Sequence, residues 1–244
     1  MKIIPLSEGR FTVDQTKQFV PFSEGDQLQE KPVGSLLVEI QPFAVVTGYD
    51  IILFDSGLGF TKNGRLQLHQ NLMDAGINPS EITKVCMSHL HKDHAGGLVI
   101  QKEGEPDQLA FPSARYYINR KEMAFAFEKG LPSYETNRFQ FLQNHPQVEL
   151  LDDEGRIDGY ISHHLTGAHS RFHQVFEIRE DGKTVFFGGD DAPQLQQMRH
   201  RFVAKYDFDG RKTMELRQQW WKQGEAEKWT FLFYHDVKNP VWSF

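Results

Sequence analysis

Residues 89–94 read His-Leu-His-Lys-Asp-His, and they follow an apolar run that is typical of a buried strand. Four of these six side chains are histidine or aspartate, which are donors that suit zinc, iron or manganese. Because residues two apart in an extended chain point to the same side, His89 and His91 can bind one metal ion together. Asp93 and His94 follow where the chain is expected to turn into a helix, so they face a different point. The string predicts a site for two metal ions.

Short apolar runs bounded by turn residues predict most of the remaining elements. Strands are expected at 35–40, 43–47, 51–54, 82–87, 114–118, 160–165, 174–179, 184–187 and 230–234. Helices are expected at 66–75, 121–127 and 214–223, and Asp181-Gly182 is a hairpin signal. The aromatic stretch 130–146 is either a helical cap over the site or a plain surface connection. Strand series that alternate with helices predict one layered α/β domain over residues 1–244.

The overall composition bears on partners and location. A net charge of −6 argues against a nucleic-acid partner, because phosphate binding relies on clustered Lys and Arg. The single cysteine, Cys86, excludes an intramolecular disulfide, so a reducing compartment is suitable. The sequence has neither an apolar run of signal-peptide length at residues 1–10 nor a membrane-spanning one elsewhere. We therefore expect a soluble cytoplasmic protein with a small-molecule substrate and no membrane partner.

Five short motifs together resemble the metallo-β-lactamase superfamily of hydrolases, and the resemblance covers nearly the whole chain. Their order and their placement at strand ends both match that family. In chain order they are Asp55-Ser-Gly57-Leu-Gly59, the string at 89–94, Thr166-Gly-Ala-His169, Gly188-Gly189-Asp190 and Phe233-Tyr-His235-Asp236. The resemblance implies a four-layer αββα sandwich with the metal ions at one edge.

The resemblance also implies how the ligands divide between two divalent metal ions. One ion would be held by His89, His91 and His169, the other by Asp93, His94 and His235, with Asp190 shared between them. Physical sense supports this division, because a shared carboxylate and a bridging hydroxide neutralise the repulsion between two cations. Metal binding lowers the pKa of water from about 16 to about 7, so that hydroxide is the nucleophile.

Two further carboxylates have roles implied by the same resemblance. Asp93 is also placed to accept a proton from the nucleophilic water, as a catalytic residue. Asp55 would support the ligands from behind.

Two departures from the family pattern concern the later motifs. The third histidine follows Gly-Ala and not Pro-Gly, so the geometry of its turn is open. Asp190 is followed by Asp191, and a shift of one residue would exchange them. We assign the bridge to Asp190 because it directly follows the two glycines that end the strand. Asp191 then lies behind the ligands or in solvent, and His173 is expected to pack behind the site without binding metal.

The substrate class rests on the branch of the family. Residues 71–79, 88–98 and 169–174 look like the acyl homoserine lactonase and organophosphate hydrolase branch, which favours cleavage of a lactone or ester bond. One feature argues against a true quorum-signal lactonase. That branch can place a tyrosine that polarises the carbonyl directly after the residue matching Asp190, and this sequence has none there.

Two alternatives stay open. One is a single-iron oxidoreductase of the persulfide dioxygenase type, which would not need Asp93, His94 and His235 as ligands. The other is a phosphodiester hydrolase, which the acidic net charge disfavours. Zinc is the expected metal, although iron and manganese suit the same donors. The oligomeric state does not follow from the sequence.

Overall fold

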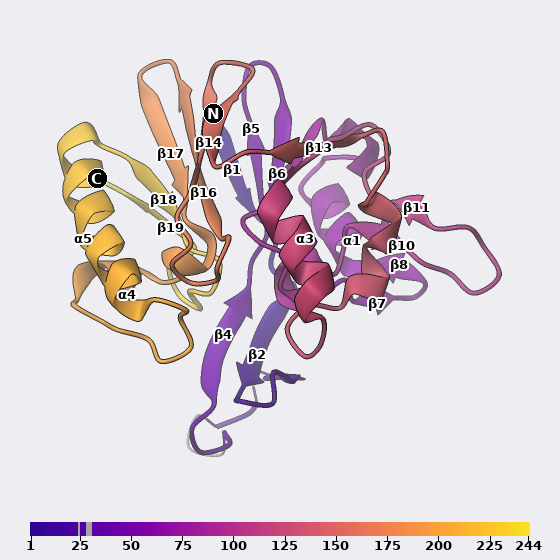
Figure 1. Cartoon of the computed structure of the whole chain (residues 1–244), viewed down its shortest axis with the longest axis horizontal. Helices are drawn as coiled ribbons and strands as arrows, with labels where there is room; N and C mark the ends of the chain where they lie inside the picture. Colours follow the sequence, from indigo (N-terminus) through magenta and orange to yellow (C-terminus); the bar gives the residue numbers. More distant parts are fainter. Residues whose placement is uncertain (24, 28–30) are drawn as a thin grey trace.

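Two six-stranded sheets lie face to face in the computed structural model, which describes residues 1–23, 25–27 and 31–244 (Figure 1). The first sheet has the order β1-β5-β6-β9-β12-β13. Its strands are β1 (Lys2–Pro5), β5 (Phe43–Val46), β6 (Ile51–Phe54), β9 (Lys84–Cys86), β12 (Arg115–Asn119) and β13 (Val148–Leu151). The second has the order β14-β15-β16-β17-β18-β19. Its strands are β14 (Glu154–Ile157), β15 (Ile161–Leu165), β16 (Gln174–Glu180), β17 (Lys183–Phe187), β18 (Thr230–Leu232) and β19 (Val241–Ser243).

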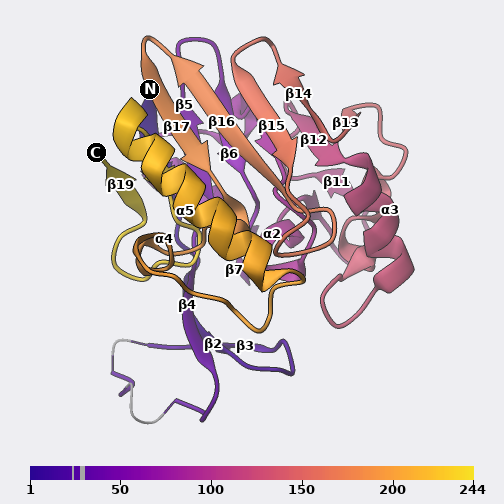
Figure 2. The same cartoon turned by 60° about the vertical axis from the view of Figure 1, so that its left-hand side comes forward.

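Helices cover the outer face of each sheet (Figure 2). Apolar side chains of α1 (Gln67–Asp74) and α3 (Arg120–Lys129) pack on the first sheet, and those of α4 (Leu195–Arg199) and α5 (Gly210–Glu227) on the second. A third cluster fills the space between the sheets, where the Phe54 and Phe187 rings stack with centroids 4.9 Å apart. The architecture is therefore the four-layer αββα sandwich that the resemblance implied.

Shorter elements connect these layers. They are β2 (Gly9–Val13), β3 (Phe19–Pro21), β4 (Leu36–Ile40), β7 (Thr61–Lys62), β8 (Arg65–Leu66), η2 (Pro79–Glu81), α2 (Lys92–Ala95), β10 (Val99–Ile100), β11 (Gln108–Leu109), η3 (Thr136–Arg138), η4 (Gln140–Leu142) and η5 (Gly189–Asp191). Strands β2, β3 and β4 form a separate small sheet that projects beyond the sandwich (Figure 1).

The direction of four strands creates one functional edge. Strand β6 runs parallel to β9 in the first sheet, and β17 runs parallel to β18 in the second. The carboxyl ends of parallel strands meet at the same edge of a sheet, so the segments that follow these strands gather there. Those segments begin at Asp55, Met87, Gly188 and Phe233. Each of these four segments carries one of the five sequence motifs.

Most predicted elements are confirmed within a few residues, including the hairpin at Asp181-Gly182, where φ is 50° and 70°. Among residues 130–146 the structure has the two short 3₁₀ turns η3 and η4 and no longer helix, so a helical cap was the wrong alternative. The segment instead packs inward, with Phe139 and Leu142 buried. In the described part of the chain, no helix combines the length and apolar character needed to cross a bilayer. The cytoplasmic location stays a prediction.

Candidate metal centre

The structure brings all seven predicted metal ligands together at the edge where the parallel strands end. Donor atoms of His89, His91, His169 and Asp190 lie within 4.8 Å of one another, and those of Asp93, His94 and His235 form a second such group. The first group contains the histidines of the first predicted set with Asp190, and the second contains the three residues of the second predicted set. A third group consists of Asp55, His89 and His94.

In the first set the imidazole nitrogens face a common point. The distance from His89 Nε2 to His91 Nδ1 is 2.8 Å, and from His91 Nδ1 to His169 Nε2 it is 3.4 Å. His89 and His91 leave the end of β9 on the same side, as two residues in extended chain should. His169 comes from the loop between β15 and β16, on the opposite sheet.

Asp190 lies between the two sets and turns one carboxylate oxygen toward each. Its Oδ2 is 3.2 Å from His169 Nε2, while its Oδ1 is 3.2 Å from His94 Nε2 and 3.0 Å from His235 Nε2. Asp93 Oδ2 is 3.5 Å from the same Nε2 atoms of His94 and His235. This is the geometry of a carboxylate that two cations can share.

These residues fit a pair of divalent ions. The side-chain atoms His94 Nε2 and Asp190 Oδ1 are buried and, within the described chain, make no hydrogen bond. A buried polar atom without a partner is energetically unfavourable, so both atoms need a partner at the point that they face. Imidazole and carboxylate donors suit zinc, iron and manganese.

Four of the five site histidines are fixed through their other ring nitrogen. His94 Nδ1 is 2.7 Å from Asp55 Oδ2, and His235 Nδ1 is 2.7 Å from a backbone carbonyl oxygen, that of Glu39. In the same way His89 Nδ1 contacts Ser88 Oγ at 3.0 Å, and His169 Nδ1 contacts Asp207 Oδ1 at 2.9 Å. Such contacts set the tautomer and orient the free nitrogen toward a metal.

Asp55 lies where the resemblance implied, behind the ligands. One oxygen accepts from Ser88 N at 2.7 Å, and the other accepts from Ser88 Oγ at 2.6 Å and contacts His94. Both oxygens therefore hold the segment after β9 and the ring of His94 in place. Its φ of 54° is unusual for a residue other than glycine, and these contacts hold that conformation.

Asp191 is not solvated, and that alternative was wrong. It is fully buried, where it accepts from His169 N at 2.7 Å and contacts His173 Nδ1 at 3.0 Å. His173 in turn accepts from Asp190 N at 3.1 Å through Nε2. Asp191 and His173 thus connect the loop carrying His169 to the turn carrying Asp190, and both pack behind the site.

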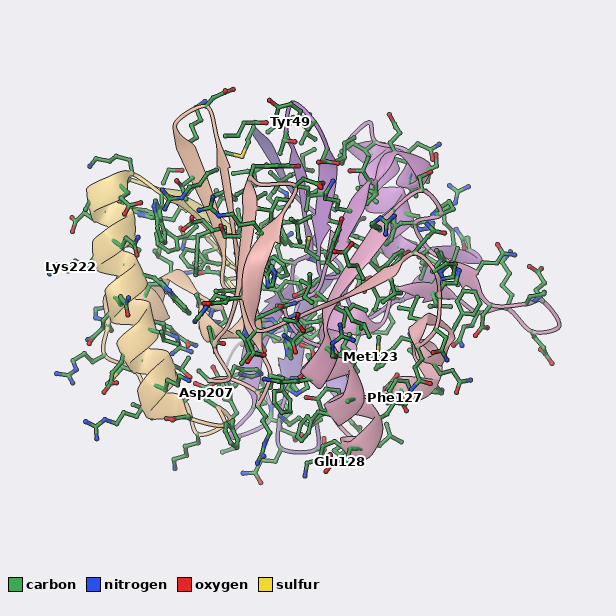
Figure 3. All side chains as sticks on the ribbon, turned by 45° about the horizontal axis from the view of Figure 1, so that its top comes forward. Tyr49, Met123, Phe127, Glu128, Asp207 and Lys222 are labelled. Atoms are coloured by element: carbon green, nitrogen blue, oxygen red, sulfur yellow. The ribbon has the colours of Figure 1, made fainter. Side chains whose placement is uncertain are left out.

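The sequence did not predict two residues with buried side chains that support His169. Asp207 contacts its ring, and Arg217 of α5 lies 3.5 Å from Asp207 and donates to Asp191 O at 2.6 Å. Asp207 lies just before α5 (Figure 3), close to Asp209, which caps that helix. Because acidic residues are common before helices, the sequence could not show that Asp207 has a different role from Asp209. Arg217 had no signal, because a charged residue on a helix normally faces solvent.

The electrostatics of the site favour positive charge at the second set. Burial, together with the neighbouring imidazoles, lowers the pKa of His89 and His91, which keeps them in the neutral form that binds metals. Burial also opposes charge on His94, but the carboxylates of Asp190, Asp93 and Asp55 outweigh it and raise its pKa well above the usual range. A cation there is stabilised by the same carboxylates.

A close backbone contact brings two motifs together. Gly96 N donates to Gly57 O at 2.8 Å, and a Cβ at Gly96 would lie 2.2 Å from Leu58 O. Only glycine fits such an approach. The Glu8 carboxylate fixes the same loop by accepting from Leu58 N at 2.6 Å. Burial raises the pKa of Glu8 to about 7.

The family model of the Metallo-beta-lactamase superfamily matches residues 41–219, which is most of the chain. The chain therefore belongs to the metallo-β-lactamase superfamily of hydrolases. None of the curated protein sequences matches it.

Solved structures with the same fold cover nearly all of the chain. A probable metal-dependent hydrolase from Staphylococcus aureus has a TM-score of 0.80 at 18% identity, covering 99% of this chain and 91% of that one. The dizinc quorum-quenching lactonase AidC has a TM-score of 0.72 at 20% identity, with 98% and 88% covered. The hydrolase AbOPH has a TM-score of 0.72 at 21% identity, with 99% and 89% covered.

Asp207→Asn should weaken metal binding without removing a ligand. The substitution removes the carboxylate that orients His169, and such contacts typically change metal affinity by about 10- to 100-fold. Chelator competition would measure the affinity. The matched control is Asp209→Asn, two residues away, because asparagine also caps helices. Equal affinities for the two variants would mean that Asp207 does not orient His169.

Glu8→Gln should make stability less dependent on pH. With a folded pKa raised to about 7, Glu8 contributes stability that is complete below its unfolded pKa of 4.5 and is lost as pH rises through 7. Urea unfolding measures the free energy of unfolding at each pH. Between pH 5 and pH 8 this free energy should rise by roughly 2 kcal/mol for Glu8→Gln relative to wild type. Glu128→Gln, on the exposed surface of α3 (Figure 3), is the control and should gain nothing. If the free energy of unfolding of both variants changes equally between pH 5 and pH 8, the ionisation of Glu8 does not affect the stability of the protein.

Proposed function

We propose that this chain is a dinuclear metal-dependent hydrolase that cleaves a lactone or ester bond of a small molecule, within one domain spanning residues 1–244. His89, His91 and His169 hold one ion, Asp93, His94 and His235 hold the other, and Asp190 is shared. The observation that carries the proposal is the position of Asp190, with one oxygen facing each set at 3.0 to 3.2 Å. Zinc is the proposed metal.

Bound in these sets, two divalent ions would supply a water of lowered pKa as nucleophile and a Lewis acid for the substrate oxygen. The chain's own residues supply orientation and proton transfer. Asp93 Oδ2 lies 3.5 Å from His94 Nε2 and His235 Nε2 in the second set and can accept a proton there, while its backbone oxygen is fixed by the Tyr234 hydroxyl at 2.6 Å. Hydrolysis by this arrangement needs no serine or cysteine nucleophile.

The intact second set supports hydrolysis over single-iron oxidation. Asp93, His94 and His235 are all buried and converge, which a one-iron site would not need. AidC is a dizinc lactonase whose structure was solved in complex with a product, N-hexanoyl-L-homoserine, and this supports lactones as the first class to test. Phosphoester hydrolysis stays the second candidate on the likeness to the organophosphate hydrolase branch.

The direct test is turnover by zinc-loaded protein on γ-butyrolactone, a nitrophenyl ester, a thioester and a phosphodiester. We expect the lactone or ester to be hydrolysed and an alcohol and a carboxylate to form. Turnover of the phosphodiester alone would replace the proposed reaction with phosphoester hydrolysis. Oxygen consumption by iron-loaded protein with a persulfide substrate would favour the oxidoreductase.

Metal analysis should find close to two ions per chain, and Asp190→Asn should reduce that number to about one. The substitution removes the charge that offsets two adjacent cations. Asp93→Ala should keep the first ion and lower turnover strongly, because Asp93 faces only the second set. Asp236→Asn is the control, since Asp236 follows His235 but contacts Leu195 N, Lys238 N and Asn239 N and no ligand. Two ions in Asp190→Asn would show that the sets bind independently.

A further inference from the structure

A cavity of about 330 Å³ lies between α3 and the loop 166–173 that carries His169, and we call it the basic cavity. Its charged and aromatic lining consists of Lys121, Phe125, Glu128 and Lys129 of α3 and of Arg171 and Phe172 of the loop. The whole chain has a net charge of −6, so three cations around one small cavity do not follow from the composition. The mechanism proposed above uses none of these residues.

The aromatic wall of the basic cavity continues to the metal centre. The ring centroid of Phe125 is 5.4 Å from that of Phe172 and 6.0 Å from that of Tyr134. The Tyr134 ring in turn lies 4.9 Å from the His91 ring. The cavity is therefore separated from a ligand of the first set by one buried tyrosine.

The loop wall of the basic cavity is held rigidly to the same set. Thr166 N and Gly167 N both donate to His173 O, at 2.8 and 3.1 Å, which closes the loop at its base. Gly167 has a φ of 58°, and a Cβ there would lie 2.8 Å from Arg171 O, so the turn is tight and requires glycine. Arg171 and His169 lie in this one closed loop, so their relative position is fixed.

Two aromatic rings orient the guanidinium of Arg171. Its carbon Cζ lies 5.1 Å from the centroid of the Phe208 ring and 5.8 Å from that of Phe125. Contacts of this kind hold a guanidinium through its flat face and leave its N–H groups free to donate. Phe208 is itself attached to the loop, because its N donates to His169 O at 2.9 Å. Lys129 Nζ lies 5.7 Å from the centroid of the Phe125 ring on the other wall.

The charges of the basic cavity leave one cation unbalanced. Lys121 pairs with Asp153 at 2.6 Å, whereas neither Arg171 nor Lys129 forms an ion pair with a carboxylate in the described part of the chain. The three cations of the lining, less the carboxylates of Glu128 and Asp153, leave a net charge of +1. One anionic group would neutralise that charge. A guanidinium can bind a carboxylate through two parallel hydrogen bonds.

We propose that the basic cavity binds a carboxylate carried by the substrate, so that this enzyme prefers lactones or esters with an anionic arm. The inference rests on the proposed lactone or ester hydrolysis and specifies its substrate class. Arg171 holds the carboxylate, and the rings of Phe125 and Phe172 contact the apolar part of the arm. A volume of this size suits part of a small molecule. Arg171 takes no part in bond cleavage, so its contribution appears in KM and not in kcat.

The test compares two esters of adipate that differ only at the remote carboxylate, namely the mono(p-nitrophenyl) ester and the same compound with that carboxylate capped as a methyl ester. Zinc-loaded wild type should show a kcat/KM about tenfold higher for the free carboxylate. Arg171→Gln should abolish this preference by raising KM for the free carboxylate, with two metal ions still bound. Arg171→Lys should retain part of the preference, because it keeps the charge but not the paired donors. Lys222→Gln is the control, since Lys222 is an exposed cation of α5 on the side of the molecule away from α3 (Figure 3).

The outcomes separate this inference from the proposed function. If wild type hydrolyses both esters without preferring the free carboxylate, or if Arg171→Gln keeps the preference, the inference is wrong and the function stands. Loss of metal from Arg171→Gln would also overturn the inference, because Arg171 would then support the loop of His169. If wild type hydrolyses neither ester nor any lactone, the function is wrong, and calorimetry with monomethyl adipate tests the cavity alone. Weaker binding by Arg171→Gln than by Lys222→Gln would then support an anion site, and equal binding would overturn both proposals.

Discussion

Two divalent cations held side by side repel each other strongly unless negative charge lies between them. In this molecule Asp190 is placed to supply that charge, because it turns one carboxylate oxygen toward each proposed set. Its backbone is set by the turn after β17, by His173, and by the Arg217 contact to the next carbonyl. Much of the surrounding structure therefore serves to keep one carboxylate in one orientation.

The sandwich meets this requirement by joining two sheets at one edge. His89, His91, Asp93 and His94 follow β9 of the first sheet, whereas Asp190 and His235 follow β17 and β18 of the second. Neither sheet alone carries a complete set. Direct contacts strengthen the junction, since Gln174 of β16 bonds to Ser88 O and Met87 O at 2.9 and 2.8 Å.

Only the resemblance to the family implied that His169, Asp190 and His235 join the four candidate ligands at residues 89–94, whose own signal is local. Histidine and aspartate at two- and three-residue spacings after an apolar strand require no knowledge of distant contacts. Asp207 and Arg217 gave no such signal, because their roles come from contacts with residues far away along the chain. The charge state of Glu8 was equally hidden, since burial cannot be read from one acidic residue near the N-terminus. For Asp191 the alternatives differed only in burial, and the fold put it inside. The strands β1, β2 and β3 were missed: β1 pairs with β5 and β2 with β4, which are distant in the chain, and β3 has only three residues.

The order of the ligands along the chain has a consequence for how the centre is assembled during synthesis. A nascent chain that has left the ribosome as far as α3 already contains His89, His91, Asp93 and His94, but no complete set. The first set gains His169 after β15, the shared carboxylate arrives only after β17, and His235 is added after β18. Since chains fold from the N-terminus as they emerge, the four early donors spend part of their existence without their partners. Binding of an ion by this partial cluster would precede formation of the second sheet. The metal ions of the cell would then first bind to an incompletely folded chain.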